Sequence, residues 1–191
     1  MNYIEYQEEE LIINKTFEKE TINPTRKQEF KNCNFINCIF QEELESIIFI
    51  NCNLINCDFS NQNLSNSSIL NTTLKQCKGI GCNLSRSTLQ ETIIEECNLE
   101  YSNLNECRLK KVTIKNTRGN YSSLKNCKLE KVIFQNNELE KADLTNTNLS
   151  KINLKTNQIN GIVINPESLK GCIIEENQAL LLVKLLGVTI E

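Results

Sequence analysis

The chain has 191 residues, of which 39% are hydrophobic and 24% are charged, and its formal net charge is −3. This balance is typical of a soluble globular protein and excludes a highly charged disordered chain. The sequence contains no histidine and no tryptophan. Every mechanism that needs an imidazole base is therefore excluded, and we expect neither catalytic residues nor a cofactor.

The N-terminal residues, MNYIEYQEEE, carry carboxylates where a signal peptide has basic and then apolar residues. No run of about 18 apolar residues, the length needed to cross a membrane, occurs in the chain. We therefore expect a cytoplasmic protein that does not span a membrane.

Large apolar residues recur at every fifth position from Phe49 to Ile174, and only Gly79 and Gly119 interrupt the series. A strand repeats every 2 residues and a helix every 3.6, so neither can keep a five-residue repeat on one side over this length. The backbone must therefore turn by a constant angle with each repeat.

The position two residues before each central apolar residue holds small side chains, and all ten cysteines fall there. Cys33, Cys57, Cys77 and Cys97 are then expected to stack at the coil spacing of about 4.8 Å. The pairs Cys33/Cys38, Cys52/Cys57 and Cys77/Cys82 are five residues apart, unlike the CxxC pairs of zinc sites, and the cytoplasm keeps thiols reduced. The sequence predicts buried structural thiols and no metal site.

The segments CNFIN, CNLIN, CDFSN, CNLSR and ADLTN resemble the pentapeptide-repeat family, whose commonest repeat is A(D/N)LXX. The resemblance implies an all-β fold, a right-handed quadrilateral parallel β-helix in which four repeats form one square coil, followed by a short C-terminal α-helix. Residues 1–29 would form an N-terminal cap and an irregular first coil, residues 30–174 the β-helix, and residues 175–191 a C-terminal dimerisation helix and tail. Residues 20 apart would form internal ladders, such as Leu64, Leu84, Leu104, Leu124 and Leu144.

The step from Phe40 to Phe49 is nine residues instead of five. We interpret residues 41–48, QEELESII, as a loop insertion of four residues. Three carboxylates would make the tip of this loop acidic: Glu42, Glu43 and Glu45. Before it, Ile12, Phe17 and Ile22 suggest one irregular first coil.

After Ile174 the repeat gives way to EENQALLLVKLLGVTIE. A helix is predicted over 178–186, with Asn177 as its N-cap and Gly187 after its last turn. The helix is apolar nearly all round, which is more than its own last coil can cover. We therefore predict a homodimer with an interface formed by Leu180, Leu182, Val183, Leu185, Leu186, Val188 and Ile190.

Charge is distributed unevenly along the chain, because residues 1–105 hold 15 acidic and 8 basic residues and residues 106–191 hold 9 and 13. One wall collects bases between Arg108 and Lys170. Two adjacent walls collect the carboxylates of Asp58, Glu95, Glu96, Glu100, Glu138 and Glu140. Ordinary solvated faces explain such charges about as well as a binding surface does. At one corner, Tyr101 and Tyr121 lie one coil apart and could stack.

Several details resemble one branch of the family, the Qnr-type proteins that protect bacterial DNA gyrase and topoisomerase IV from quinolones. These details are the chain length, the early loop and the ending ESLKGCIIEENQALLLVKLLGVTIE. The resemblance implies a dimeric DNA-mimicking rod that binds a type II topoisomerase through its acidic loop and walls, without touching nucleic acid or membrane. No second loop interrupts the coils from Phe49 to Ile174, and the net charge is only −3. The alternative is a non-enzymatic β-helical scaffold with an unrelated partner.

Overall fold

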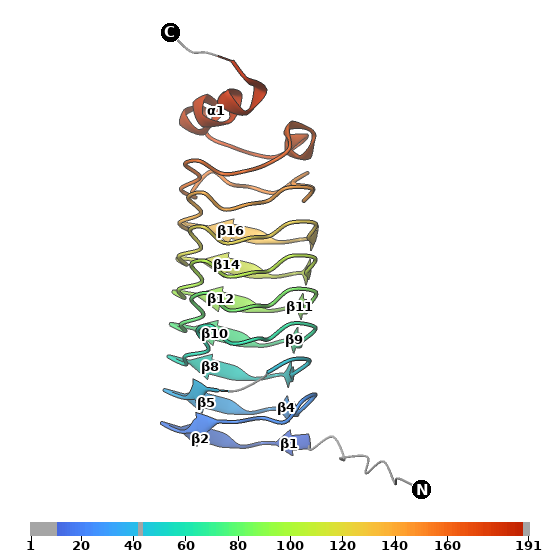
Figure 1. The fold of residues 1–191 in the computed structure, drawn as a ribbon, viewed down its shortest axis with the longest axis vertical. Helices are drawn as coiled ribbons and strands as arrows, with labels where there is room; N and C mark the ends of the chain where they lie inside the picture. Colours follow the sequence, from blue (N-terminus) through green and yellow to red (C-terminus); the bar gives the residue numbers. More distant parts are fainter. Residues whose placement is uncertain (1–10, 42–43, 189–191) are drawn as a thin grey trace, which may run out of the picture.

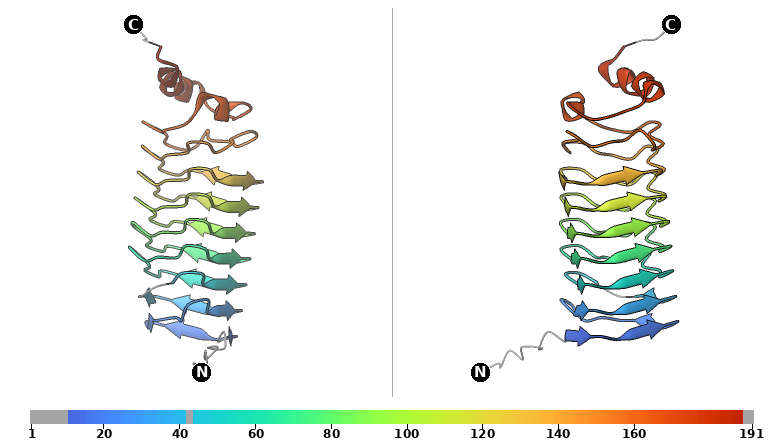
Figure 2. Two further views of the ribbon diagram at one scale, coloured as in Figure 1. Left: turned by 45° about the vertical axis from the view of Figure 1, so that its right-hand side comes forward. Right: turned by 180° about the vertical axis from the view of Figure 1, so that it is seen from behind.

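The computed structural model describes residues 11–41 and 44–188. Short strands stack in parallel into a straight rod, with β1 (Leu11–Ile13) at one end and α1 (Glu176–Val183) at the other (Figure 1). The two further views show the same regular stack from other sides (Figure 2). The predicted parallel β-helix with a short C-terminal helix is confirmed.

Two walls of the rod are seven-stranded parallel sheets. Wall 1 consists of β1, β4 (Glu29–Lys31), β7 (Ile48–Ile50), β9 (Ser68–Leu70), β11 (Thr88–Gln90), β13 (Arg108–Lys110) and β15 (Lys128–Glu130). Wall 2 consists of β2 (Thr16–Glu18), β5 (Asn34–Ile36), β8 (Asn53–Ile55), β10 (Thr73–Lys75), β12 (Ile93–Glu95), β14 (Thr113–Lys115) and β16 (Ile133–Gln135).

The other two walls are held mainly by single parallel bridges between coils. Wall 3 begins with β3 (Thr21–Ile22) and β6 (Ile39–Phe40) and continues through bridges from Asp58 to Gln158. Wall 4 contains the bridges from Asn63 to Val163. The chain then forms the 3₁₀ helix η1 (Pro166–Leu169), α1 and the 3₁₀ helix η2 (Lys184–Leu186).

The corners of the square explain how the chain turns with so few glycines. The residue two positions after a central residue adopts a positive φ, and 26 non-glycine residues of the described chain do so. Twelve of them are asparagine, the residue that enters this region most readily after glycine. Side-chain amides also bond from coil to coil, for example Asn51 Nδ2 to Asn32 Oδ1 at 3.1 Å. The abundant asparagine of the sequence thus forms nearly half of these corners.

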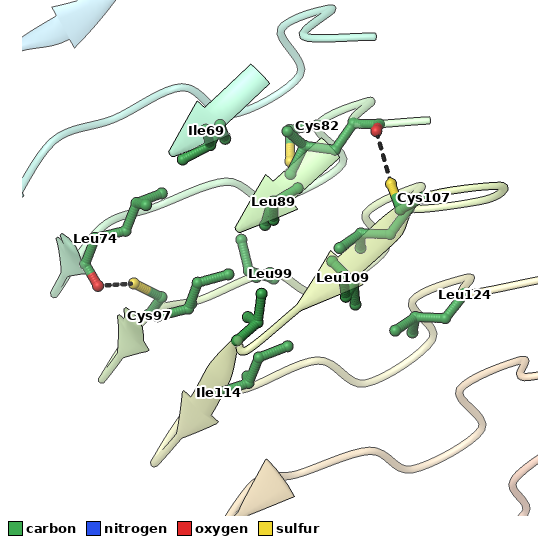
Figure 3. Close-up of a cluster of buried hydrophobic side chains, with 14 of the residues drawn as sticks. Ile69, Leu74, Cys82, Leu89, Cys97, Leu99, Cys107, Leu109, Ile114 and Leu124 are labelled. Carbon is green, nitrogen blue, oxygen red and sulfur yellow. Dashed lines mark hydrogen bonds between the residues drawn. The ribbon is translucent and has the colours of Figure 1, made fainter. Parts of the chain in front are cut away.

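The central apolar residues point inward and stack on one another from coil to coil. The ladder Leu64, Leu84, Leu104, Leu124 and Leu144 is buried throughout, as predicted. Figure 3 shows Leu89 and Leu109, on successive coils of wall 1, with Ile114 from the neighbouring wall 2 and Leu99 from the opposite wall 3. The first coils use aromatic rings instead, with Phe17 stacked on Phe35 at 4.9 Å between ring centroids.

The segment 41–48 does not form the predicted insertion. Phe49 of β7 pairs with Phe30 of β4, so this coil has one residue fewer than the 20 that separate Phe49 from Ile69. Leu44 is buried in the core, and Ser46 donates a backbone hydrogen bond to Ser65 O at 2.8 Å, as a corner residue of the next coil does. The nine-residue step therefore hides a fourth repeat centred on Leu44 and shortened by one residue.

This shortened coil also changes the predicted cysteine stack. Phe35 pairs with Leu54, so Cys33 lies beneath Cys52 and not beneath Cys57. Cys38 takes the place predicted for Cys33, because Ile39 bridges to Asp58. The stack along this edge is therefore Cys38, Cys57, Cys77 and Cys97.

The C-terminal helix begins earlier than predicted. Its N-cap is Glu175, whose side chain accepts a bond from the Gln178 backbone while Gln178 Oε1 accepts one from Glu175 N at 3.0 Å. Asn177 is therefore a helical residue and not the cap. Gly187 ends the segment with φ 73°, the left-handed conformation expected of a residue that follows a helix.

Candidate protein-interaction surfaces

The acidic residues of wall 2 are offset by neighbouring groups. Glu95 lies between two lysines of the coils on either side, 3.9 Å from Lys75 Nζ and 3.2 Å from Lys115 Nζ. At the adjoining corner, Glu96 accepts a hydrogen bond of 2.8 Å from Gln76 Nε2. Because cations flank Glu95 on both sides, wall 2 presents little free negative charge at this point.

The predicted acidic residues of wall 3 are held by amide groups. Asn120 Nδ2 lies 3.4 Å from Glu100 Oε1 and 3.2 Å from Glu138 Oε2, and Asn160 Nδ2 donates to Glu140 Oε1 at 2.9 Å. No ion pair joins these three carboxylates to a base within the described chain. The structure thus brings Glu100, Glu138 and Glu140 together on wall 3 as a group of carboxylates without an ion pair in the described chain.

The remaining predicted acidic residues lie apart from that group. Asp58 lies at the N-terminal end of wall 3, where its Oδ1 accepts a bond of 2.9 Å from Ser60 N. Glu45 pairs with Arg26 Nη2 at 3.2 Å and accepts a bond from Asn66 Nδ2 at 2.9 Å. Glu42 and Glu43 lie outside the described residues. Glu45 thus joins the first three coils at this corner of the rod.

A basic surface covers wall 1 in its C-terminal half. Arg108 on β13 pairs in register with Lys128 on β15, so like charges occupy successive coils. Glu130 lies 3.8 Å from Lys110 Nζ, and at the corner Lys111 lies 2.7 Å from Glu91 Oε1. The hydrogen bond from Lys111 lowers the pKa of the Glu91 carboxyl. Lys131, Lys151 and Lys170 extend this basic surface toward the C-terminus.

The two exposed tyrosines form the predicted stack. Their ring centroids lie 5.0 Å apart and their planes differ by 9°. Lys141, one coil further, places its Nζ 5.1 Å from the centroid of Tyr121 and donates a hydrogen bond to the Tyr121 hydroxyl at 3.2 Å. The corner therefore carries a ladder of two rings and a cation.

The C-terminal helix is attached to the last coil through Gln178, which the sequence did not single out. Its buried Nε2 donates to Leu154 O at 2.9 Å and to Asn157 O at 2.8 Å, so one amide closes the open end of the coil. The sequence signal was the spacing of Glu175 and Gln178, since an N-cap acceptor followed three residues later by Glu or Gln marks a capping box.

The predicted dimer residues divide between two sides of this end. Leu182 is buried against its own chain, and Val183 lines with Leu169 and Ile174 an apolar groove of about 230 Å³. Leu180, Leu185 and Val188 are exposed. The Leu186 side chain and Ile190 lie outside the described residues.

The cysteines are free thiols, and nine of the ten are buried. Two of these thiols donate a hydrogen bond to a backbone carbonyl of the preceding coil (Figure 3). Cys97 Sγ donates to Leu74 O at 3.5 Å, and Cys107 Sγ donates to Leu84 O at 3.0 Å. Burial raises the pKa values of Cys82 and Cys107 to about 12. No group of three or more cysteine or carboxylate side chains in the described chain could hold a metal ion, and no helix described is long and apolar enough to cross a membrane.

Comparison with known proteins identifies the repeat. Residues 92–164 match the family model described as a pentapeptide repeat region, and residues 49–78 match the model described as pentapeptide repeats (8 copies). No curated protein sequence matches the chain significantly.

The solved structure of one pentapeptide-repeat protein shares the fold, and a second solved structure is similar to a lesser degree. HetL, a protein involved in heterocyst differentiation regulation from Nostoc sp. strain PCC 7120, is 13% identical with a TM-score of 0.52, covering 86% of each chain. The plasmid-mediated fluoroquinolone resistance protein QnrB1 is 14% identical with a TM-score of 0.47, covering 95% of this chain and 100% of its own. At these identities the likeness concerns the fold alone. The repeats matched by both models and the four-walled stack of coils together place this chain in the pentapeptide-repeat family.

Proposed function

We propose that this chain is a Qnr-like, non-enzymatic rod that binds a bacterial type II topoisomerase, DNA gyrase or topoisomerase IV, and protects it from quinolones in the cytoplasm. The observation that carries the proposal is the C-terminal end. The segment ESLKGCIIEENQALLLVKLLG, which resembles the ending of that branch, folds as a cap held by Gln178, and it leaves Leu180, Leu185 and Val188 exposed.

These exposed residues support a homodimer. Single apolar side chains are common on protein surfaces, but Leu180, Leu185 and Val188 are exposed together on one short segment at the end of the rod. Joining two rods at this end about a twofold axis would cover these residues on both chains. A twofold rod also matches the twofold symmetry that the resemblance implies for the topoisomerase.

The contact with the enzyme is assigned to wall 3. Glu100, Glu138 and Glu140 form no ion pair within the described chain, whereas Glu95 on wall 2 lies between two lysines. A protein that takes the place of DNA has to offer charge that its own bases do not offset, and such a field acts over a Debye length of roughly 8 to 10 Å. Wall 1, which carries Arg108 and Lys128, would then face away from the DNA-binding groove.

The second candidate is an interaction scaffold with an unrelated partner. It is favoured by the pairing of carboxylates within the rod, seen at Glu95 and Glu45, because this pairing reduces the negative field that a DNA mimic needs. Such a scaffold would use the same stiff rod without any effect on DNA topology.

A supercoiling assay with purified gyrase separates the two candidates. Gyrase is inhibited with ciprofloxacin, and the chain is added in increasing amounts. We expect supercoiling to recover with the wild-type chain, and to recover less with the triple variant Glu100→Gln, Glu138→Gln, Glu140→Gln. The matched control, Glu95→Gln, should protect like the wild type. No recovery at any concentration, with no binding to gyrase, would leave the scaffold as the function.

A further inference from the structure

The ladder of tyrosines belongs to one corner column that is filled at some levels and empty at others. Its residues lie one coil apart and all have positive φ: Asn61, Gly81, Tyr101, Tyr121, Lys141 and Gly161. The column therefore places an amide, a glycine, two rings, a cation and a second glycine in order along the rod. We call it the corner ladder.

One end of the aromatic stack is already covered by a cation. The Tyr121 face directed toward the C-terminus receives Lys141, whose Nζ lies 5.1 Å from the ring centroid. The opposite face of Tyr121 is stacked on Tyr101 at 5.0 Å. Tyr121 thus has a neighbour of this chain on either side, Tyr101 stacked on one ring face and Lys141 near the hydroxyl end on the other side.

The corresponding face of Tyr101 is open. The next level of the ladder is Gly81, which has no side chain to place against the ring. Among the described residues, only Asn61 approaches the position of a Cβ at Gly81 within 4 Å, with its Oδ1 at 2.7 Å. Tyr101 is accordingly more exposed than Tyr121, 60% against 46%.

The missing level has the size and chemistry of a flat cation. Tyr101 and Asn61 lie two coils apart, roughly twice the 4.8 Å coil spacing. The Asn61 amide reaches the Cβ position of Gly81, so a planar group would lie outside that amide, against the open face of Tyr101. A ring face attracts cations, and a guanidinium can also stack on it and donate to several acceptors in its plane. One acceptor adjoins this level, Asn61 Oδ1. Glu100, the residue before Tyr101, has no ion pair within the described chain and adds negative charge on the adjoining wall.

We propose that the level of Gly81, between Tyr101 and Asn61, is a binding site for an arginine side chain of a partner protein. The guanidinium would extend the ladder by one level, with its plane on Tyr101. It would donate a hydrogen bond toward Asn61, and the negative charge of Glu100 on the adjoining wall would attract it. The site does not depend on which protein supplies the arginine, so it stands whether or not the partner is a topoisomerase.

Two variants remove the site in different ways. Gly81→Asn fills the level with an amide while leaving both rings in place. Asparagine suits the positive φ of Gly81, and the contact to Asn61 Oδ1 is relieved by rotating that amide, as in the asparagine ladders of other corners. Tyr101→Asn removes the open ring and uses the commonest corner residue. Lys141→Asn is the control, because it changes the covered end of the ladder.

The probes are three short blocked peptides that contain arginine, citrulline or phenylalanine at the same position. Binding is followed by NMR, from the ring protons of Tyr101, or from the Gly81 and Glu100 amides in the Tyr101→Asn variant. We expect the arginine peptide to bind weakly and saturably, and Gly81→Asn and Tyr101→Asn to weaken it about five- to tenfold, the loss of one cation–π contact. Lys141→Asn should bind the arginine peptide at least as well as the wild type.

The other outcomes overturn the proposal. Citrulline has nearly the shape of arginine without its charge, so equal binding of the two peptides would show that no cation is recognised. Tighter binding of the phenylalanine peptide would assign the level to an aromatic group. Wild-type affinity in Gly81→Asn would show that the arginine binds elsewhere on the rod.

Discussion

The ring of Phe59 fills the space that a side chain at Gly79, one coil further along the rod, would occupy. A Cβ at Gly79 would clash with Phe59 Cε2 and lie 2.9 Å from Leu99 Cδ2. Gly119, the other gap in the apolar series, has less crowded surroundings, with Leu139 Cδ2 at 3.1 Å as the nearest side-chain atom. The break in the series at Gly79 is therefore a local packing adjustment around one large ring.

Gly79→Ala is expected to lower the free energy of unfolding by about 1 to 3 kcal/mol, because the ring of Phe59 must leave its place. Adding Phe59→Leu should recover part of that loss. Urea unfolding of the single and double variants measures both effects. Gly119→Ala is the control and should cost less, since one methyl group of Leu139 can move aside. Equal losses in the two glycine variants would contradict this account of Gly79.

The repeat centred on Leu44 is part of the core. Leu44→Ala should lower the free energy of unfolding by about 2 to 5 kcal/mol, as for other buried leucines. Glu45→Gln, next to it, should cost about 1 kcal/mol or less, since its pair with Arg26 is partly exposed. Thermal unfolding with both variants tests the comparison. Deleting 42–45, which an insertion would tolerate, should unfold the N-terminal coils, and a deletion variant of wild-type stability would restore the interpretation as a loop.

The fold could be predicted because the five-residue period is a direct consequence of the geometry. From Phe49 onward this period predicts which residues point inward, including the leucine ladder. It also predicts that Tyr101 and Tyr121 lie at the same corner on successive coils. The register before Phe49 could not be obtained in the same way. A repeat shortened by one residue, with Leu44 four residues after Phe40, has the same spacing in the sequence as an insertion. Only the pairing of Phe30 with Phe49 distinguishes the two.

The candidate site was less predictable from the sequence. Periodicity places a carboxylate on a wall, but it does not say which neighbour reaches it. Glu95 and Glu100 each directly follow a central apolar residue of a repeat, yet Glu95 lies between two lysines and Glu100 lies beside an amide. Such differences depend on side-chain lengths and directions across coils. The corner ladder was recognised only as two rings, because the meaning of Gly81 depends on Tyr101 lying next to it in space.

The buried thiols should make the fold less stable in alkali. Burial raises the pKa values of Cys52 and Cys127 to about 11, from 9.0 for an exposed thiol. Between these values the unfolded chain releases protons that the folded chain keeps, so the free energy of unfolding falls as pH rises through this interval. Urea unfolding at pH 8 and at pH 10.5 measures the fall. The double variant Cys52→Ala, Cys127→Ala should show a smaller fall, and an unchanged slope would contradict the assignment to these thiols.

Gln178 is expected to hold the C-terminal helix in place. Gln178→Ala removes the side-chain donor to the buried Asn157 carbonyl and one of the donors to Leu154 O, a loss of about 1 to 3 kcal/mol. Hydrogen exchange should therefore quicken in α1 while the central coils keep their protection. Asn177→Ala is the matched control, since Asn177 is exposed and is not the cap, and it should change little. Faster exchange in the control than in Gln178→Ala would reverse the roles of the two residues.

The dimer can be tested at positions that leave the fold intact. Leu180 and Leu185 are exposed on the helical end, whereas Leu182 is buried against its own coil. Lysine at both exposed positions should yield a monomer, because burying two unpaired charges in a twofold interface costs more than such an interface can offset. The melting temperature of the coils should stay close to that of the wild type at low protein concentration. Leu182→Lys is the contrasting variant and should release the cap itself, which hydrogen exchange would detect. Sedimentation measures the state of each variant at micromolar concentration. A wild-type chain that sediments as a monomer of 21.9 kDa would refute the dimer, and it would weaken the proposed match to a twofold topoisomerase.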